Sequence, residues 1–138
     1  MKHWLYPANP KYYDVISAFT KEPKTAWPIS SKVEDGDFVY IYTGAPYKQI
    51  MFKCKVVEVG LPVDDVMYQA EKYAKVSKEK PNKSFMLLET IIEFDQNKES
   101  PLSFSWLRQN GLKGSIMGPQ CLENNETLFK YIGEIEAQ

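Results

Sequence analysis

The hydrophobic residues of this chain follow two spacings, one typical of strands and one typical of helices. A continuous β-branched and aromatic run, Phe38–Tyr42, comes directly after the turn signal Asp35-Gly36-Asp37 and predicts a buried central strand. Apolar residues alternate with polar ones in Ile50–Val56, which predicts the second arm of a hairpin with one buried face. Ser84–Phe94 is a third strand segment. We expect all three strands in one curved sheet.

Four other segments have apolar residues three or four positions apart, the spacing of one helix face. In the first segment, Asn9 is a good N-cap residue and Pro10 suits the first helical position. Asp64 and Asp65 suit the N-terminus of the second helix, and Gly111 stops the third. The four predicted helices run from Pro10 to about Lys21, from Val63 to Ala74 with closure before Pro81, from Ser103 to Gly111, and from about Glu126 onward.

Short aromatic and polar segments connect these elements. His3–Tyr6 is rich in aromatic residues and ends before Pro7, so we expect a short strand. Trp27 has polar residues on both sides and no apolar periodicity around it, which places it on a loop. Two further loops are expected at Gly44–Gln49, inside the hairpin, and at Gly114–Gln120, before the last helix.

The composition indicates a globular protein of ordinary size. The chain has 138 residues, of which 43% are hydrophobic and 25% charged, and it contains no repeat or linker that would divide it. We therefore expect one α+β domain over residues 1–138 with a single core. The apolar runs are far shorter than the roughly 20 residues that span a bilayer, so no membrane segment is expected. The first residues do not resemble a secretory signal, and a cytoplasmic location is the expectation.

Charge is distributed unevenly along the chain, although the formal net charge is only -1. Three segments contain seven of the 17 basic residues and none of the 18 acidic ones: residues 1–13, 38–57 and 101–121. If these segments converge in space, one face of the domain is basic, which is typical of proteins that bind polyanions. A solvated mosaic of charges without function is the alternative.

Few residues suit catalysis or metal binding. His3 is the single histidine, and its place beside Trp4 in a predicted strand gives it a structural explanation. Cys54 and Cys121 lie far apart in sequence and fit reduced structural thiols. One His and two separated Cys cannot form a typical zinc site. No phosphate-binding loop or dinucleotide motif is present. We therefore predict no catalytic residue, no metal and no cofactor.

Aromatic residues are the remaining candidates for a function. They make up 14% of the chain, and several, among them Trp27, Tyr47 and Trp106, fall where loops rather than strand interiors are expected. A tryptophan in a loop can plug the end of a barrel. It can also form a stacking wall for a planar ligand, an interaction of roughly 1 to 3 kcal/mol per stacked base. The residues by themselves leave both possibilities open.

A set of short motifs resembles the EVE domain family, which belongs to the PUA-like superfamily together with YTH domains. The N-terminal motifs are Trp4-Leu5-Tyr6 with Asn9-Pro10, Trp27, the run from Gly36 to Tyr42, Gly44-Ala45-Pro46-Tyr47, and Cys54-x-Val56. The C-terminal motifs are Gly111-Leu112-Lys113-Gly114, Gly118-Pro119-Gln120 and Tyr131-Ile132. The resemblance implies a PUA-like curved mixed β-barrel with flanking helices. It also implies a pocket at the barrel mouth that accepts a modified base flipped out of DNA or RNA.

The resemblance assigns roles to individual positions. Trp27 would be a wall of an aromatic cage, and Tyr42-Thr43 would end the strand that lines the pocket. Gly44 to Tyr47 would form the rim. Asn9-Pro10 and Gly118-Pro119-Gln120 would approach from two other loops. The helix around Val66–Lys75 and the segment Lys78–Lys83 match no motif of the family, which leaves their role open.

These observations predict a reader that binds a modified base of DNA or RNA, with a methylated base as the first expectation. Lys11, Lys48 and Lys113 are expected at the nucleic-acid backbone. A buried methyl group contributes only about 0.8 kcal/mol, so strong discrimination also needs a polar contact. The candidates are Asn9, Thr43 and Gln120. The alternatives are an enzyme acting on a nucleotide or RNA, and a module that binds a small molecule or a protein.

Overall fold

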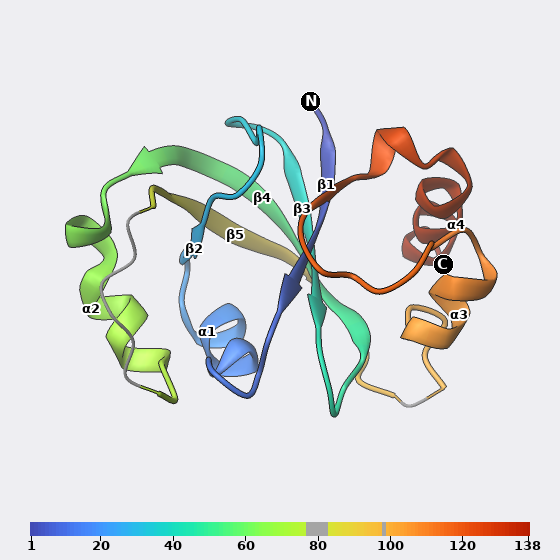
Figure 1. Ribbon diagram of the computed structural model, residues 1–138, viewed down its shortest axis with the longest axis horizontal. Helices are drawn as coiled ribbons and strands as arrows, with labels where there is room; N and C mark the ends of the chain where they lie inside the picture. The colour runs from blue at the N-terminus through green and yellow to red at the C-terminus, as the bar shows by residue number, and fades with distance from the viewer. Residues whose placement is uncertain (77–82, 98) are drawn as a thin grey trace.

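The computed structural model describes residues 1–76, 83–97 and 99–138 (Figure 1). Its strands form one six-stranded sheet in the order β2-β5-β4-β3-β1-β6. The strands are β1 (His3–Ala8), β2 (Thr25–Pro28), β3 (Phe38–Thr43), β4 (Gln49–Leu61), β5 (Phe85–Glu93) and β6 (Gln120–Cys121). The helices are α1 (Val15–Lys21), α2 (Val63–Tyr73), α3 (Phe104–Gln109) and α4 (Glu126–Glu136), with a short 3-10 turn, η1, at Leu122–Asn124.

The sheet is mixed and curls into a half-barrel. β1 and β3 run parallel, whereas the other pairs are antiparallel. The three strands predicted from their apolar patterns, β3, β4 and β5, are neighbours in this sheet and are confirmed. Several register shifts interrupt the pairing of β4 with its two neighbours, which bends this 13-residue strand. The predicted fold class, α+β with a curved mixed sheet and flanking helices, is confirmed.

Buried apolar residues lie on both faces of this one sheet instead of in one cluster. Successive residues of β1 and β3 alternate between the faces: Trp4 and Val39 belong to one cluster, Leu5 and Tyr40 to the other. α1 packs on the first face, and α3 and α4 pack on the second. A third, small cluster contains Ala26, Val66 and Phe85, where α2 meets β2 and β5. α2 thus lies at one end of the molecule and α3 and α4 at the other (Figure 1).

The first helix begins later than the sequence predicts. It starts at Val15, and Asp14 is its N-cap, with a side-chain oxygen that accepts from the backbone N–H of Ser17 at 3.4 Å. Asn9 instead starts a turn, because its Oδ1 accepts from the backbone N–H of Lys11. Tyr13 pairs as an isolated bridge with Ala74, just after α2, and this pairing keeps its backbone out of a helix.

Trp27 lies on a strand, and the predicted loop is wrong. It belongs to β2, a four-residue edge strand, where it pairs with Met86 of β5. On the open side of β2, the backbone N–H of Ala26 donates to the side chain of Gln69 from α2. Four residues are too few to show the alternation of apolar and polar residues that predicts a strand. The residues that pair with β2 are also distant in the sequence, so the local sequence does not reveal it.

The other helices agree with prediction. α2, α3 and α4 lie in the expected segments, and Gly111 follows α3 with a φ of 111°, in the left-handed region. A Cβ at that position would lie 2.8 Å from the backbone nitrogen of Leu128. Pro81, and most of the segment 78–83, fall outside the described residues. Within the described ranges, every helix is too short or too polar to cross a bilayer.

Candidate functional site

A cavity of about 710 Å³ opens between α2, β2, the start of β5 and the turn before α1. Its lining combines aromatic, apolar and polar residues, and α2 with the residues just after it supplies most of the apolar ones. The aromatic residues and prolines are Tyr12, Tyr13, Trp27, Pro28 and Phe85; the apolar residues are Ala26, Met67, Ala70, Ala74 and Val76; the polar residues are Asn9, Glu71, Lys75 and Lys83.

The aromatic wall of the cavity has a fixed geometry. The Trp27 ring meets the Tyr13 ring edge to face, with centroids 5.4 Å apart and planes at 82°. On the core side, Trp27 also contacts Phe19 at 5.5 Å. Trp27 is half-buried, so its ring belongs partly to the core and partly to the cavity wall. Packing on two sides therefore orients the ring before any ligand binds.

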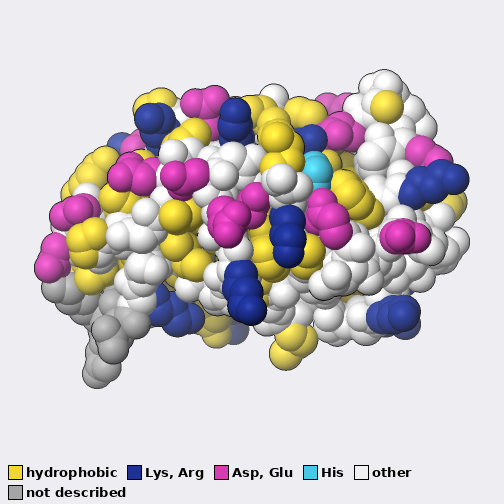
Figure 2. Space-filling model, turned by 90° about the horizontal axis from the view of Figure 1, so that it is seen from above, with side chains coloured by type: hydrophobic (Ala, Val, Ile, Leu, Met, Phe, Trp, Pro, Cys, Tyr) yellow, Lys and Arg dark blue, Asp and Glu magenta, His cyan; other side chains and the backbone are white. Residues whose placement is uncertain are grey.

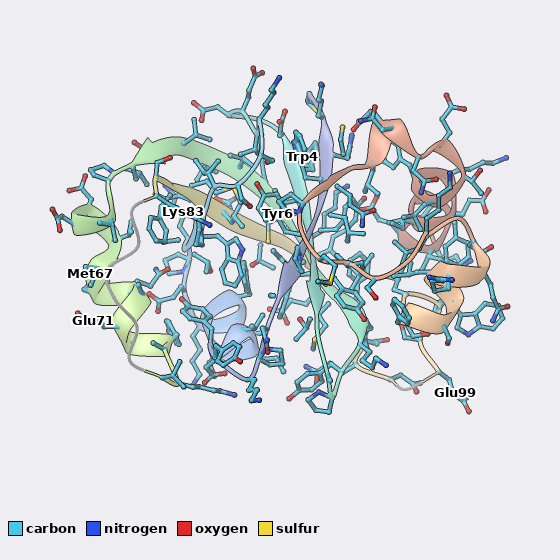
Figure 3. The ribbon with its side chains drawn as sticks, viewed as in Figure 1. Trp4, Tyr6, Met67, Glu71, Lys83 and Glu99 are labelled. Atoms are coloured by element: carbon cyan, nitrogen blue, oxygen red, sulfur yellow. The ribbon has the colours of Figure 1, made fainter. Side chains whose placement is uncertain are left out.

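α2 supplies the opposite wall through one of its faces. Met67, Ala70 and Glu71 lie at i, i+3 and i+4 on one face of α2, and Ala74, its C-cap residue, follows them along the cavity. Figure 3 shows Met67 and Glu71 on α2 and Lys83 near the entry to β5. The two alanines leave space that larger side chains would fill. The hollow thus follows from small residues on this face of α2.

The other face of α2 is held by polar contacts. Buried Gln69 accepts from the backbone N–H of Ala26, and its Nε2 donates to the carbonyl of Lys24 at 2.9 Å. The hydroxyl of Tyr73 donates to Glu22 Oε2 at 2.7 Å, and Lys72 approaches the same oxygen at 3.4 Å. The Tyr73 hydrogen bond lowers the pKa of Glu22, and the charge of Lys72 adds to this effect while desolvation opposes it. α2 is therefore anchored to α1 and β2 by a charged network.

Backbone contacts hold the turn before α1 against the end of α2. The N–H of Asp14 donates to the carbonyl of Tyr73 at 2.7 Å, and the N–H of Lys75 donates to the carbonyl of Tyr12 at 2.9 Å. The side chain of Lys75 reaches the carbonyl of Pro10 at 2.6 Å. These contacts bring Asn9, Tyr12 and Tyr13 to the cavity, although α2 lies about 60 residues further along the chain.

Tyr13 has an unusual hydroxyl. The oxygen is buried and has no hydrogen-bond partner among the residues that the structure describes. Burial raises the pKa of Tyr13, and the nearby Tyr73, Glu22 and Asp14 raise it further. The phenol is therefore neutral at physiological pH. Its ring contributes aromatic surface to the cavity wall, and its oxygen lies away from solvent.

The structure brings some of the predicted site residues to this cavity. Asn9 and Trp27 line it. Pro10 is buried beside this edge, where its side chain is 3.8 Å from the position a Cβ on Gly44 would take. The N–H of Gly44 donates to the carbonyl of Ala8 at 2.9 Å. The ends of β1 and β3 therefore meet near the Asn9-Pro10 turn.

Other predicted residues lie elsewhere, so the pocket expected at the barrel mouth is not assembled as predicted. The Tyr42 side chain packs on the opposite face of the sheet, edge to face with Phe104. Thr43 is fully buried, with a hydroxyl that lacks a partner among the described residues. Tyr47 is 37% exposed in the hairpin turn and does not line the cavity. Tyr42 was misplaced because adjacent strand residues face opposite sides of the sheet.

The segment Gly118-Pro119-Gln120 is also apart from the cavity. Gln120 belongs to β6 and pairs with Leu5 of β1. β6 and β2 occupy the two ends of the strand order, so Gln120 and Trp27 do not share a wall. Of the three polar residues expected to read the base, only Asn9 is at the cavity.

The predicted backbone lysines are spread over the surface. Lys11 lies over the ring of Tyr12, a cavity residue, at 5.8 Å from the centroid. Lys48 lies over Phe104 at 5.5 Å, on the α3 side of the molecule, and Lys113 is exposed in the loop after α3. Of the three, Lys11 is adjacent to the cavity.

The three acid-free segments do converge, because β1, β3, β4 and β6 are consecutive in the sheet. They do not produce a uniformly basic surface on the face shown in Figure 2, where acidic and basic side chains are interspersed. Lys53 illustrates the reason, since Glu136 of α4 pairs with it at 2.6 Å. The prediction of a basic face overlooked acidic residues that other segments bring to the same place.

Most cavity residues were not found from the sequence. The helical spacing of Met67, Ala70 and Ala74 was interpreted only as part of a buried helix face. The available signal was Glu71, a charged residue beside these apolar positions, because charged residues are rarely buried in a packed helix face. No local pattern predicts that Tyr13, Lys75 and Lys83 line a cavity. They reach it through contacts between distant segments, such as the bridge between Tyr13 and Ala74.

The single histidine has a structural environment. His3 Nδ1 pairs with Glu123 at 2.7 Å, and its ring lies against Phe38 and Phe129, with centroids 5.2 and 4.6 Å away. Cys54 is buried, and burial raises the pKa of its thiol to about 12. Across residues 1–76, 83–97 and 99–138, no cluster of three or more His, Cys, Asp or Glu side chains could hold a metal ion.

Comparison with known proteins identifies the fold. No family model matches the chain, and no curated protein matches it by sequence. An ASCH protein from Zymomonas mobilis has 11% identity and a TM-score of 0.63, with 96% of this chain and 94% of that chain covered. A protein from Pseudomonas putida has 17% identity and a TM-score of 0.65, with 96% and 98% covered.

A third solved structure has a nucleic acid bound. The human THYN1 protein, in complex with DNA containing 5-methylcytosine, has 14% identity to this chain and a TM-score of 0.64. The alignment covers 100% of this chain and 99% of the human chain. At such low identity, these likenesses concern the fold. The chain therefore has the PUA-like α+β fold of its ASCH and THYN1 neighbours.

Proposed function

We propose that this protein is a nucleic-acid-binding reader that takes a modified base into the cavity between α2 and β2. The observation that carries the proposal is the half-buried Trp27 ring, fixed by Tyr13 and Phe19, in the wall of a cavity of about 710 Å³. Cavities that bind small ligands are commonly about 300 to 1,000 Å³. A flipped base is planar and can stack on such a wall.

The fold neighbours support this choice over other ligands. Human THYN1, whose structure contains 5-methylcytosine DNA, aligns with the whole of this chain. The motifs that resemble EVE domains include Trp27 and Asn9, which both line the cavity. We propose on these grounds that the protein is an EVE-type member of the PUA-like superfamily.

The cavity offers two kinds of affinity for a methylated base. Stacking on Trp27 contributes roughly 1 to 3 kcal/mol. Met67, Ala70 and Ala74 provide an apolar surface for a methyl group, which contributes about 0.8 kcal/mol when buried. Since a methyl group changes affinity only about fourfold, polar groups at the rim must add to the selection.

Phosphate contacts would come from the lysines around the opening. Lys75 and Lys83 line the cavity, and Lys11 is next to it in the Asn9-Pro10 turn. Lys48 and Lys113 lie further away and would contact a longer strand. Such contacts strengthen binding regardless of base and weaken with salt.

The test is a binding screen of the purified protein against oligonucleotides that each carry one modified base, as DNA and as RNA, at two salt concentrations. We expect one class of modified base to bind several-fold more tightly than its unmodified counterpart, with affinity falling as salt rises. Lys83→Ala should weaken modified and unmodified strands alike and reduce the salt dependence. Lys130→Ala, an exposed α4 lysine, is the matched control.

Two other results would replace the proposal. Conversion of a bound base to a new product would identify an enzyme. Salt-independent binding of a free nucleoside, with no preference for the strand, would identify a small-molecule module. Equal binding of all oligonucleotides, unchanged by Trp27→Ala, would contradict base reading.

A further inference from the structure

We infer that Glu71 is the specificity-determining residue of this cavity and that it selects bases with an exocyclic amino group at their hydrogen-bonding edge. The inference rests on the proposed function, because it names the base class that the same cavity takes. It also supplies the polar contact that methyl recognition alone does not provide.

Glu71 is the only acidic side chain among the described residues that line the cavity. It lies on α2, one turn after Met67 (Figure 3), and Ala70 and Ala74 line the cavity with it. These neighbours are apolar, and the two alanines are short. Among the described lining residues, the Glu71 carboxylate is therefore the one negative charge that the cavity offers a ligand.

The carboxylate of Glu71 takes part in none of the ion pairs among the described residues. Lys75, four positions later in the sequence, lies beyond the end of α2, after the extended C-cap residue Ala74. Its Nζ donates to the carbonyl of Pro10 at 2.6 Å. By contrast, Glu22 on the other side of α2 receives contacts from Gln69, Lys72 and Tyr73. Glu22 thus helps to fix the helix, whereas Glu71 has no ion pair among the described residues.

The chemistry of a carboxylate determines what it can read. An ionised Glu accepts hydrogen bonds and cannot donate them. It pairs with the amino group of cytosine or adenine. A thymine or uracil carbonyl at the corresponding position would face the carboxylate oxygens without a proton between them. The cavity should therefore favour an amino base over an oxo base of the same shape.

Two bases of matched shape separate this effect from methyl recognition. 5-Methylcytosine and thymine have the same ring methyl group. Cytosine has an amino group at C4 and an acceptor at N3, whereas thymine has a carbonyl at C4 and an N–H at N3. In single-stranded oligonucleotides that contain one or the other at a fixed position, the wild type should prefer 5-methylcytosine by about tenfold. Glu71→Gln should reduce the preference to about threefold or less, because an amide both donates and accepts.

Glu71→Lys should reverse the preference, because an ammonium group only donates. Glu134→Gln, an exposed acid of α4 at the other end of the molecule, should leave the wild-type preference intact. Glu71 is exposed, so circular dichroism and thermal unfolding of its variants should match the wild type. The readout is the ratio of two affinities on one protein preparation, which a change in the folded fraction does not alter.

The outcomes separate base selection by Glu71 from base binding in the cavity. If Trp27→Ala weakens both oligonucleotides but Glu71→Gln and Glu71→Lys keep the tenfold ratio, the cavity binds a base and Glu71 does not select it. If the wild type binds neither oligonucleotide better than an abasic strand, and Trp27→Ala changes nothing, the proposed function fails and the inference with it.

Discussion

The two ends of this molecule attach helices to the same sheet in different ways. At the α3 and α4 end, one cluster contains ten buried apolar residues, including Leu107, Leu128 and Ile132. At the α2 end, the corresponding cluster contains three, Ala26, Val66 and Phe85. The first end is filled, whereas the second has a cavity of about 710 Å³ beside it. The difference indicates that the α3 and α4 end serves stability and that the α2 end leaves room for a ligand.

Each end also has an anchoring carboxylate. Glu136 of α4 pairs with Lys53 at 2.6 Å and accepts from the Tyr40 hydroxyl at 3.2 Å. Glu22 accepts from the Tyr73 hydroxyl of α2. α4 is also held by a large apolar cluster, whereas α2 has a small one and depends on polar contacts for much of its attachment. The position of α2 should therefore be more sensitive to changes in charge.

The largest expected effect is on the filled end. Leu107→Ala removes a fully buried side chain of α3 and should lower the free energy of unfolding by about 2 to 5 kcal/mol. Leu87 is partly exposed at the edge of the α2 cluster, so Leu87→Ala should lower the free energy of unfolding by less. Urea unfolding measures both. Equal losses would show that the two ends contribute alike to stability.

Filling the cavity should affect binding and not stability. Ala70→Leu places a larger side chain on the cavity face of α2 and keeps a high helix propensity. We expect base affinity to fall by about tenfold or more, the equivalent of about 1.4 kcal/mol, with little change in unfolding free energy. Fluorescence anisotropy with a bound oligonucleotide and urea unfolding of the same sample measure the two quantities. Unchanged affinity would place the base elsewhere.

Acid should loosen α2 before α4. The Tyr73 hydrogen bond holds the pKa of Glu22 below its unfolded value of about 4.3, so its stabilisation is present above that pH. The contribution is lost as the pH falls through the lower folded pKa. Amide hydrogen exchange between pH 7 and pH 3 should show α2 losing protection first, and Glu22→Gln should remove that pH dependence. Earlier loss in α4 would contradict the comparison.

The smallest effect is expected at His3. Its contacts with Glu123, Phe38 and Phe129 belong to the α4 side of the molecule, away from the cavity. His3→Gln should leave base affinity within a few-fold in a titration of the folded variant. A loss of more than about a hundredfold, roughly 2.7 kcal/mol, would give His3 a role in function.

The sequence predicted the elements whose patterns are local. β3, β4 and β5 are long enough to show their apolar patterns, and α4 has a regular apolar face in Leu128 and Ile132. β2 was missed because four residues carry no pattern, and its edge is completed by Gln69 from a distant helix. The start of α1 was misplaced because the bridge of Tyr13 to Ala74 overrides a favourable N-cap signal.

The site was predicted in part, and the reason is geometrical. Trp27 and Asn9 were identified through a resemblance, and both line the cavity. Tyr42 was assigned to the same pocket although its side chain is on the other face of the sheet. The α2 wall was not predicted, because Met67, Ala70 and Ala74 have the spacing of any buried helix face. Whether such a face meets a core or a hollow depends on the residues opposite it.

The most direct test compares two tryptophans at the two ends of the molecule. Trp27 lines the cavity, and Trp106 is 45% exposed on α3. The measurement is the affinity per folded molecule for one oligonucleotide with the preferred modified base. Trp27→Ala should weaken binding by about 5 to 150-fold, the loss of one stacking contact of roughly 1 to 3 kcal/mol. Trp106→Ala should leave it unchanged. If Trp27→Ala unfolds the protein while the remaining folded molecules bind normally, Trp27 is a plug of the half-barrel and the cavity is not the base site.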